Sequence, residues 1–108
     1  MENVKFEEWE KFDFRIAEII EAKEHPNADK LLVLQIKIGD EQRQLVAGLR
    51  GHYEIEELIG KKVLVFANLE PVDLRGEKSE GMVLAAEDNG KISLLIPEND
   101  VDSGSKIR

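Results

Sequence analysis

The sequence contains no cysteine, which excludes two kinds of covalent or metal-based stabilisation. Neither a disulfide framework nor a zinc site built on thiolates can form without this residue. The absence suits a reducing compartment, so we expect a cytoplasmic protein. The chain also lacks any apolar run near the roughly 20 residues of a membrane-spanning helix, and its first residues lack the pattern of a signal peptide. We therefore expect a soluble protein with no membrane partner.

Residues that carry catalysis are scarce as well. The two histidines, His25 and His52, both lie beside turns, where an imidazole is more often an exposed hydrogen-bonding group than a ligand. No serine lies in a Gly-x-Ser-x-Gly elbow, and no phosphate loop or dinucleotide fingerprint is present. The 23 acidic residues will form carboxylate pairs by chance, and no spacing singles out a general acid and base. The sequence predicts no enzyme, no cofactor and no metal site.

An excess of basic charge is also missing, although nucleic-acid-binding domains are usually basic. The net charge is −8 and the pI about 4.8. The acid is unevenly distributed: residues 29–53 carry four cations against three carboxylates, and residues 61–86 carry four of each. Because salt screens each charge beyond roughly 8 Å, an acidic chain can still present one basic face. The plainer interpretation is a solvated, mixed surface.

The length of 108 residues fits one domain, and the periodicity divides it into three parts. Val4, Trp9 and Phe12 have helical spacing and predict an N-terminal helical extension over 1–12. A barrel is expected over 13–97, followed by a C-terminal extension over 98–108.

The middle of the chain alternates apolar and polar residues, as half-buried strands do. From Asp13 the alternation breaks near Ile19 and Ile20, which predicts a long bent strand with a bulge. Gly39 to Glu41 turns one hairpin, and Asn89-Gly90 is a strong signal for another. The further strands that we expect are 32–38, 44–47, 63–69 (closed by Pro71), 82–86 and 92–96, with a loop through Gly76 and Gly81 and a short helix over 53–59 that ends at Gly60.

This order predicts an all-β fold with a small helical content. A helix between the third and fourth strands is the arrangement of the oligonucleotide/oligosaccharide-binding fold (OB-fold), a five-stranded Greek-key barrel. A generic β-sandwich is the alternative, although it would normally contain more strands.

Two polar segments interrupt the strands. The first is HPNADKL, residues 25–31, in which an amide and an ammonium precede an apolar strand. The second is NLEPVDLRGEKSEGM, residues 68–82, whose glycines bracket two cations, a serine and a methionine. Such side chains at strand ends can reach phosphates, sugars and unstacked bases. The plainer interpretation is that both segments are connecting loops.

These segments, together with LVAGL at 45–49 and GKKVLVFANLEP at 60–71, occur in an order and spacing that resembles a known family. It is the tRNA-binding domain found at the C-terminus of methionyl-tRNA synthetases and as free-standing proteins, with a bacterial chaperone-like protein among its relatives. The resemblance runs from about Asp13 to the C-terminus. It implies an OB-fold homodimer that binds tRNA by shape, without catalysis, and that raises the tRNA affinity of a methionyl-tRNA synthetase catalytic subunit.

The resemblance also implies a set of tRNA-contacting residues. The positions that match the family are Asn27, Lys30, Asn68, Ser79 and Met82. Charge alone adds Arg43, Arg50, Arg75 and Lys78 to this expectation. Val72-Asp73 depart from the family, whose members often carry basic residues after the proline, and this weakens the local positive field.

Several alternatives stay open. The apolar residues of the 1–12 helix and of the tail, Val101 and Ile107, are candidates for the dimer contact, or they cap the core. A chaperone-like dimer that binds peptides is the rival function on the same fold, and an oligosaccharide-binding barrel is a weaker third. A stand-alone protein, a separate subunit and a domain of a synthetase are all compatible with the sequence.

Overall fold

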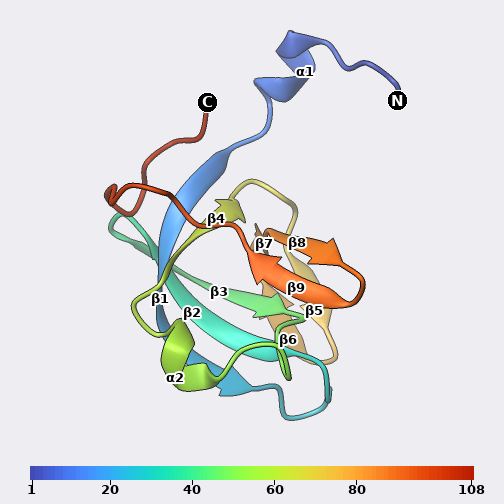
Figure 1. Ribbon diagram of the computed structural model, residues 1–108, viewed down its shortest axis with the longest axis vertical. Helices are drawn as coiled ribbons and strands as arrows, with labels where there is room; N and C mark the ends of the chain where they lie inside the picture. The colour runs from blue at the N-terminus through green and yellow to red at the C-terminus, as the bar shows by residue number, and fades with distance from the viewer.

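The fold is organised around one long strand, as Figure 1 shows for the computed structural model, which describes residues 1–108. In chain order the elements are α1 (Phe6–Trp9), β1 (Phe14–Glu24), β2 (Leu32–Ile38), β3 (Glu41–Ala47), α2 (Ile55–Leu58), β4 (Lys62–Phe66), β5 (Val72–Leu74), β6 (Glu77–Ser79), β7 (Met82–Val83), β8 (Ala85–Asp88) and β9 (Lys91–Leu94). Five strands form one antiparallel sheet in the order β3-β2-β1-β4-β7. The pairs β5–β6 and β8–β9 form two separate hairpins.

β1 bends, so its two halves pair with different neighbours. Residues from Phe14 to Glu18 pair with β4, and residues from Glu18 to Glu24 pair with β2. The register with β2 shifts between Ile19 and Glu21. A β-bulge of this kind increases the local twist and allows a sheet to curl. The bent first strand that the sequence predicts is confirmed.

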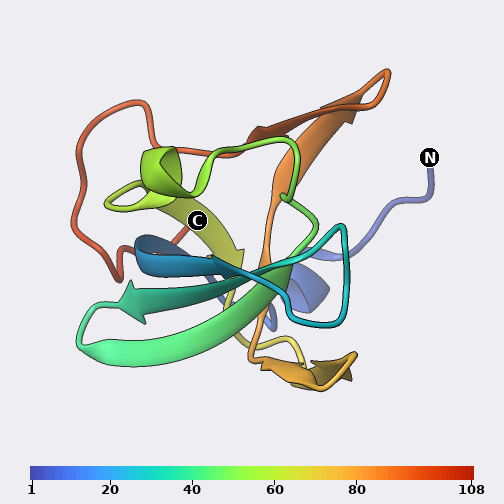
Figure 2. The same cartoon turned by 90° about the horizontal axis from the view of Figure 1, so that it is seen from below.

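The curled sheet and α2 enclose the core, and the view from below in Figure 2 shows this curl. Leu34 and Ile36 of β2 and Leu45 of β3 are fully buried, and Leu58 brings α2 onto the same cluster. α2 lies between β3 and β4 in the chain, where the sequence places its inserted helix. The predicted OB-like barrel is confirmed.

The hairpins differ from the expectation in two places. The predicted loop through Gly76 contains the β5–β6 hairpin, whose turn residues Arg75 and Gly76 have φ of 58° and 97°. A two-residue turn with both φ values positive normally carries Asn-Gly or Gly-Gly, and an arginine there hides it from the sequence pattern. The strand expected over 82–86 splits in two, because Met82–Val83 pair with β4 and the chain from Ala85 onward pairs with β9. The turn at Asn89 and Gly90 is confirmed.

Both terminal segments flank the start of β1. α1 is a single turn with no buried residue, shorter than the predicted helix, because one short stretch cannot sustain a longer helix without packing. The Trp9 ring stacks on Phe14 with centroids 5.3 Å apart. At the other end of the chain, the Ile107 N–H donates to the Phe14 carbonyl (2.9 Å), so the tail lies beside β1.

The strand expected over 63–69 is shorter in the structure, where β4 ends at Phe66.

Candidate functional site

An apolar groove of about 470 Å³ lies between the end of β3 and the two small hairpins. Twelve of its fifteen lining residues are hydrophobic. They are Leu31, Val46, Ala47, Leu49, Leu69, Val72, Leu74, Met82, Val83, Leu84, Ala85 and Ile92, joined by Gly48, Ser79 and Gly81. The groove contains no aromatic ring and no ionisable side chain, so it offers a surface for apolar or flat groups.

A second hollow, of about 480 Å³, has the opposite chemistry. Its lining includes the carboxylates of Glu24, Asp29, Glu54 and Glu56, and Arg50 is its one cation. Such a concentration of acid repels an anionic ligand, so phosphate groups are disfavoured in this hollow. No group of three His, Asp or Glu side chains in the chain is arranged to hold a metal ion. No helix has the length and apolar character that a membrane crossing requires.

Two segments form walls of the groove: residues 25–31, through Leu31, and the β5–β6 hairpin, through Val72, Leu74 and Ser79. Hydrogen bonds join these two walls. The His25 Nε2 lies 2.8 Å from the Leu74 carbonyl oxygen, which links residues 25–31 to the end of β5. The Asn27 side-chain amide donates to the Arg75 carbonyl at 3.5 Å, a weaker bond. The HPNADKL segment and the β5–β6 hairpin, 49 residues apart in the chain, are therefore neighbours. Of the predicted site residues, this places Asn27 beside Arg75, with Lys30 and Lys78 on the same two segments.

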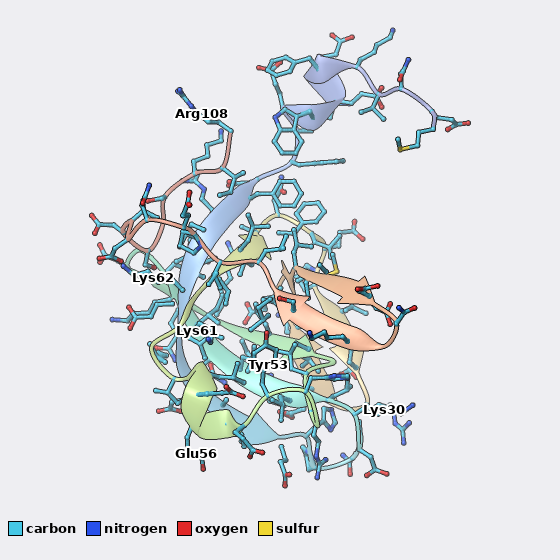
Figure 3. All side chains as sticks on the ribbon, in the orientation of Figure 1. Lys30, Tyr53, Glu56, Lys61, Lys62 and Arg108 are labelled. Carbon is cyan, nitrogen blue, oxygen red and sulfur yellow. The ribbon has the colours of Figure 1, made fainter.

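Three of the predicted site residues are cations next in the chain to residues that line the groove, which puts them at its rim: Lys30 precedes Leu31, Arg75 follows Leu74 and Lys78 precedes Ser79. Lys30, Arg75 and Lys78 are exposed, and their side chains form no hydrogen bond or ion pair. Figure 3 shows Lys30 at the edge of the molecule, at the opposite end from Arg108. Arg75 stands at the tip of its hairpin with a positive φ, a conformation that costs a non-glycine residue of order 1 kcal/mol. Free ammonium and guanidinium groups around an apolar surface suit a ligand with phosphates outside and flat groups inside.

The other two predicted arginines are engaged with the protein itself. Arg43 forms an ion pair with Glu41, and its Nη1 donates to the carbonyls of Ala67 and Glu80, the latter at 3.3 Å. The hydrogen bond and the charge of Arg43 lower the pKa of the Glu41 carboxyl. Arg50 donates to the Ala28 carbonyl (3.3 Å) and pairs with Glu24 (3.1 Å). Arg43 therefore fixes the segment around β6, and Arg50 fixes the 25–31 loop.

Ser79 is buried in the groove, with 2% of its surface exposed. Its hydroxyl donates to the Gly81 carbonyl (2.9 Å) and accepts the Val46 N–H (3.0 Å). This hydroxyl ties the end of β6 to β3, and both of its main hydrogen-bonding roles are taken. Met82, in contrast, is 41% exposed and lies on the groove.

Asn68 lies outside the groove lining and holds the N-terminal segment. Its Nδ2 donates to the Lys11 carbonyl (2.7 Å), and its Oδ1 accepts the Asp13 N–H (2.8 Å). Both ends of the amide are therefore used to fasten the start of β1 to the end of β4.

Sequence reasoning missed two residues of the site. The first is His25, which was expected to be exposed. Only 3% of its surface is exposed, because the β5–β6 hairpin covers it. His52 is exposed as expected. Gln44 is the second, since its side chain donates to the Lys78 carbonyl (2.9 Å) and holds the hairpin on β3. The position of His25 at the head of HPNADKL was the available signal.

Comparisons with known proteins identify this arrangement. Residues 14–106 match the family described as "Putative tRNA binding domain". The methionine–tRNA ligase of Thermococcus kodakarensis is 52% identical over 108 residues, which cover 100% of this chain and 15% of the ligase. The chain thus spans a small part of the length of the curated relatives that it matches.

Solved structures give the same answer. The MetRS related protein from Pyrococcus horikoshii superposes with a TM-score of 0.92 at 31% identity, with 100% of both chains covered. The chaperone CsaA from Bacillus anthracis superposes with a TM-score of 0.89 at 30% identity, with 99% of this chain and 100% of CsaA covered. By sequence match and by fold, the chain belongs to the tRNA-binding domain family.

Proposed function

We propose that this chain is a non-catalytic tRNA-binding module that increases the affinity of a methionyl-tRNA synthetase for tRNA. In this proposal residues 13–97 form the binding barrel, and 1–12 and 98–108 are extensions of a single module. The observation that carries it is the apolar groove with three unpaired cations at its rim, on a chain whose net charge is −8. Cations that stand beside one apolar groove suit a ligand that presents anionic groups next to flat, apolar ones.

The chemistry of the groove favours recognition by shape. Ser79 is the one polar side chain in the lining, and its hydroxyl is already bonded to Gly81 and Val46. The lining therefore offers no free side-chain donor or acceptor to a base edge, which is what sequence readout requires. Unstacked bases can lie against Met82 and its apolar neighbours, while phosphates meet the cations. We expect similar affinity for different tRNAs.

The gain for a synthetase comes from effective concentration. A second, weak site on the same complex makes rebinding of the tRNA intramolecular, which raises the overall affinity without a new contact at the catalytic centre. The methionine–tRNA ligase relatives support this setting, and in the enzyme of Thermococcus kodakarensis the matched region is 15% of the chain. The module itself then needs only modest affinity.

A titration of tRNA across salt concentrations tests the proposal. Each phosphate contact contributes a slope of roughly −0.7 to −0.9 in log affinity against log salt. The triple variant Lys30→Ala, Arg75→Ala, Lys78→Ala should therefore flatten the slope by about 2. Lys37→Ala is the matched control, because Lys37 is exposed on β2 near the C-terminal segment, where its carbonyl accepts from Ser103. No affinity for tRNA at low salt would refute the function.

The rival is a site for apolar peptides. It is supported by the twelve hydrophobic residues in the groove and by the superposition on the chaperone CsaA. Binding of an apolar peptide buries surface without releasing counterions, so its affinity should change little with salt. A salt-insensitive ligand in the groove, with no tRNA binding, would establish the rival.

We further propose that the module works as a homodimer. Ile96 is 59% exposed and Leu95 is 42% exposed, and they lie with Val101 and Ile107 around an apolar hollow of about 310 Å³ beside the tail. Contiguous apolar surface of this kind is typical of a protein–protein contact. Sedimentation should give a dimer at micromolar concentration, and Ile96→Asp should give a folded monomer. A wild-type monomer at that concentration would refute the dimer.

A further inference from the structure

His25 is a buried histidine whose two ring nitrogens both have partners. Nε2 lies 2.8 Å from the Leu74 carbonyl oxygen, which can only accept, so Nε2 carries the proton and donates. Nδ1 lies 2.9 Å from the Asn27 backbone nitrogen, which can only donate, so Nδ1 carries no proton and accepts. The geometry therefore fixes a neutral imidazole in one tautomer.

This imidazole makes the shorter of two bonds that hold the hairpin tip. Apart from the pairing of β5 with β6, residues 72–77 are joined to the rest of the chain by the hydrogen bond from His25 and by the 3.5 Å bond from Asn27 to Arg75. The base of the hairpin is held separately, through Gln44 and Ser79. The position of Arg75 relative to Lys30 thus depends on His25.

The same side chain also shapes its own loop. Its acceptor bond from the Asn27 N–H is a turn across residues 25–27, and the His25 N–H donates to the Leu31 carbonyl at 3.1 Å, which closes the loop at its base. Loss of the acceptor at Nδ1 therefore loosens the loop that carries Lys30. The imidazole therefore forms hydrogen bonds with both cation-bearing segments, residues 25–31 and the β5–β6 hairpin.

We propose that His25 is a positioning residue, a latch whose neutral form sets the spacing between the cations on the two walls of the groove. Protonation would place an N–H at Nδ1 against the Asn27 N–H, so the latch opens as the pH falls. This role rests on the proposed tRNA binding. It predicts that the affinity for tRNA decreases as the solution is made acidic, because only the neutral imidazole can accept the Asn27 N–H.

The direction of the expected change in tRNA affinity distinguishes the latch from a direct attraction between a charged imidazole and the RNA. The charged groups on the elements around His25 are Glu24, Asp29 and Lys30 of its own segment, Arg50 of the segment that holds Ala28, and Asp73, Arg75 and Glu77 of the hairpin. None of them forms a hydrogen bond or ion pair with the imidazole. A new positive charge acting on tRNA by attraction alone would raise the affinity as the pH falls, whereas an opened latch lowers it.

Two substitutions separate the two bonds. In His25→Asn, the shorter side chain places its oxygen near the position of Nδ1, so it can accept from Asn27 but cannot reach Leu74. In His25→Gln, the longer side chain places its amide nitrogen near the position of Nε2, so it can still donate to Leu74. His52→Asn and His52→Gln are the matched controls, because His52 is exposed and its side chain makes no hydrogen bond.

Two measurements test the latch. Nitrogen NMR of the His25 ring should show a proton on Nε2 and none on Nδ1, and acid should increase hydrogen exchange at the Asn27 amide. In tRNA binding at pH 8, His25→Asn should be about five- to tenfold weaker than wild type, the effect of losing one hydrogen bond, and His25→Gln closer to wild type. Both variants should lose the pH dependence, while the His52 variants keep it. Thermal unfolding checks that each variant is folded.

The outcomes distinguish the latch from the function. A proton on Nδ1 at pH 8, or unchanged exchange at Asn27 in acid, overturns the latch whatever the RNA does. A His25→Gln variant that keeps the wild-type pH profile, or an affinity that rises in acid, overturns the positioning role. Absence of tRNA binding at every pH overturns the proposed function and this role in it, while the NMR result still decides on the latch.

Discussion

The substitution Ser79→Ala removes a hydroxyl that holds two backbone groups in the buried end of the groove. In the native protein that hydroxyl accepts the Val46 N–H and donates to the Gly81 carbonyl, at 3.0 and 2.9 Å. Alanine lacks the Oγ atom and forms neither bond. With 2% of Ser79 exposed, water has little access to replace them.

The expected cost follows from those two groups. A buried donor or acceptor left without a partner costs about 1–3 kcal/mol. The Val46 N–H loses its partner outright, while a carbonyl such as that of Gly81 tolerates the loss better. We therefore expect Ser79→Ala to reduce the free energy of unfolding by about 2 kcal/mol. For a chain of this size, that lowers the melting temperature by about 10 °C.

Chemical denaturation measures this cost, with Ser93→Ala as the matched control. Ser93 is exposed and its side chain forms no hydrogen bond, so its variant should stay within about 0.5 kcal/mol of wild type. The midpoint for Ser79→Ala should fall with an unchanged m-value. A variant of wild-type stability that nevertheless binds tRNA more weakly would refute the reasoning, because it would show that the hydroxyl contacts the ligand rather than the backbone.

Two further predictions concern backbone packing and pH. Gly81→Ala should destabilise the fold by at least about 2 kcal/mol in the same denaturation assay, since Gly81 has a φ of 136° and an added Cβ would lie 2.9 Å from the Phe66 carbonyl oxygen. The control is Gly48→Ala, whose added Cβ would meet nothing within 4 Å. Equal destabilisation by the two substitutions would contradict this explanation. Because Arg43 lowers the pKa of Glu41, the stability from this pair is present at neutral pH and is lost as the pH falls through that lowered pKa. A carbon NMR titration should show the low Glu41 midpoint and its return toward the ordinary value in Arg43→Gln, and an unchanged midpoint would show that another group is responsible.

Features set by local sequence were predictable. The break in alternation near Ile19 and Ile20 signals the bulge, because the side-chain period of a strand is strictly two. Asn89-Gly90 signals its turn, because these residues adopt positive φ at little cost. Arg75 has the same kind of backbone without the residue type that reveals it, so the β5–β6 hairpin was not predicted.

The roles of individual site residues depend on contacts that no local pattern encodes. His25 bonds to a residue 49 positions away, Asn68 to residues 55 and 57 positions away, and Arg43 to a carbonyl 24 positions away. The motif that contains each residue is visible in the sequence. Whether its side chain faces a ligand or fastens the backbone is decided by which distant segment the fold brings beside it.

The pairing of the tail with the start of β1 has a consequence for how this module can be attached to other proteins. Both ends of the chain leave the molecule beside Phe14, while the HPNADKL loop follows the far end of the same strand. An extended strand of 11 residues spans up to about 35 Å, so Lys30 and Arg108 lie at opposite ends of the molecule in Figure 3. A protein fused at either terminus would therefore be attached at the end of β1 that lies away from this loop. For engineering, this makes the domain a terminal adaptor that can be joined through either end without blocking that loop.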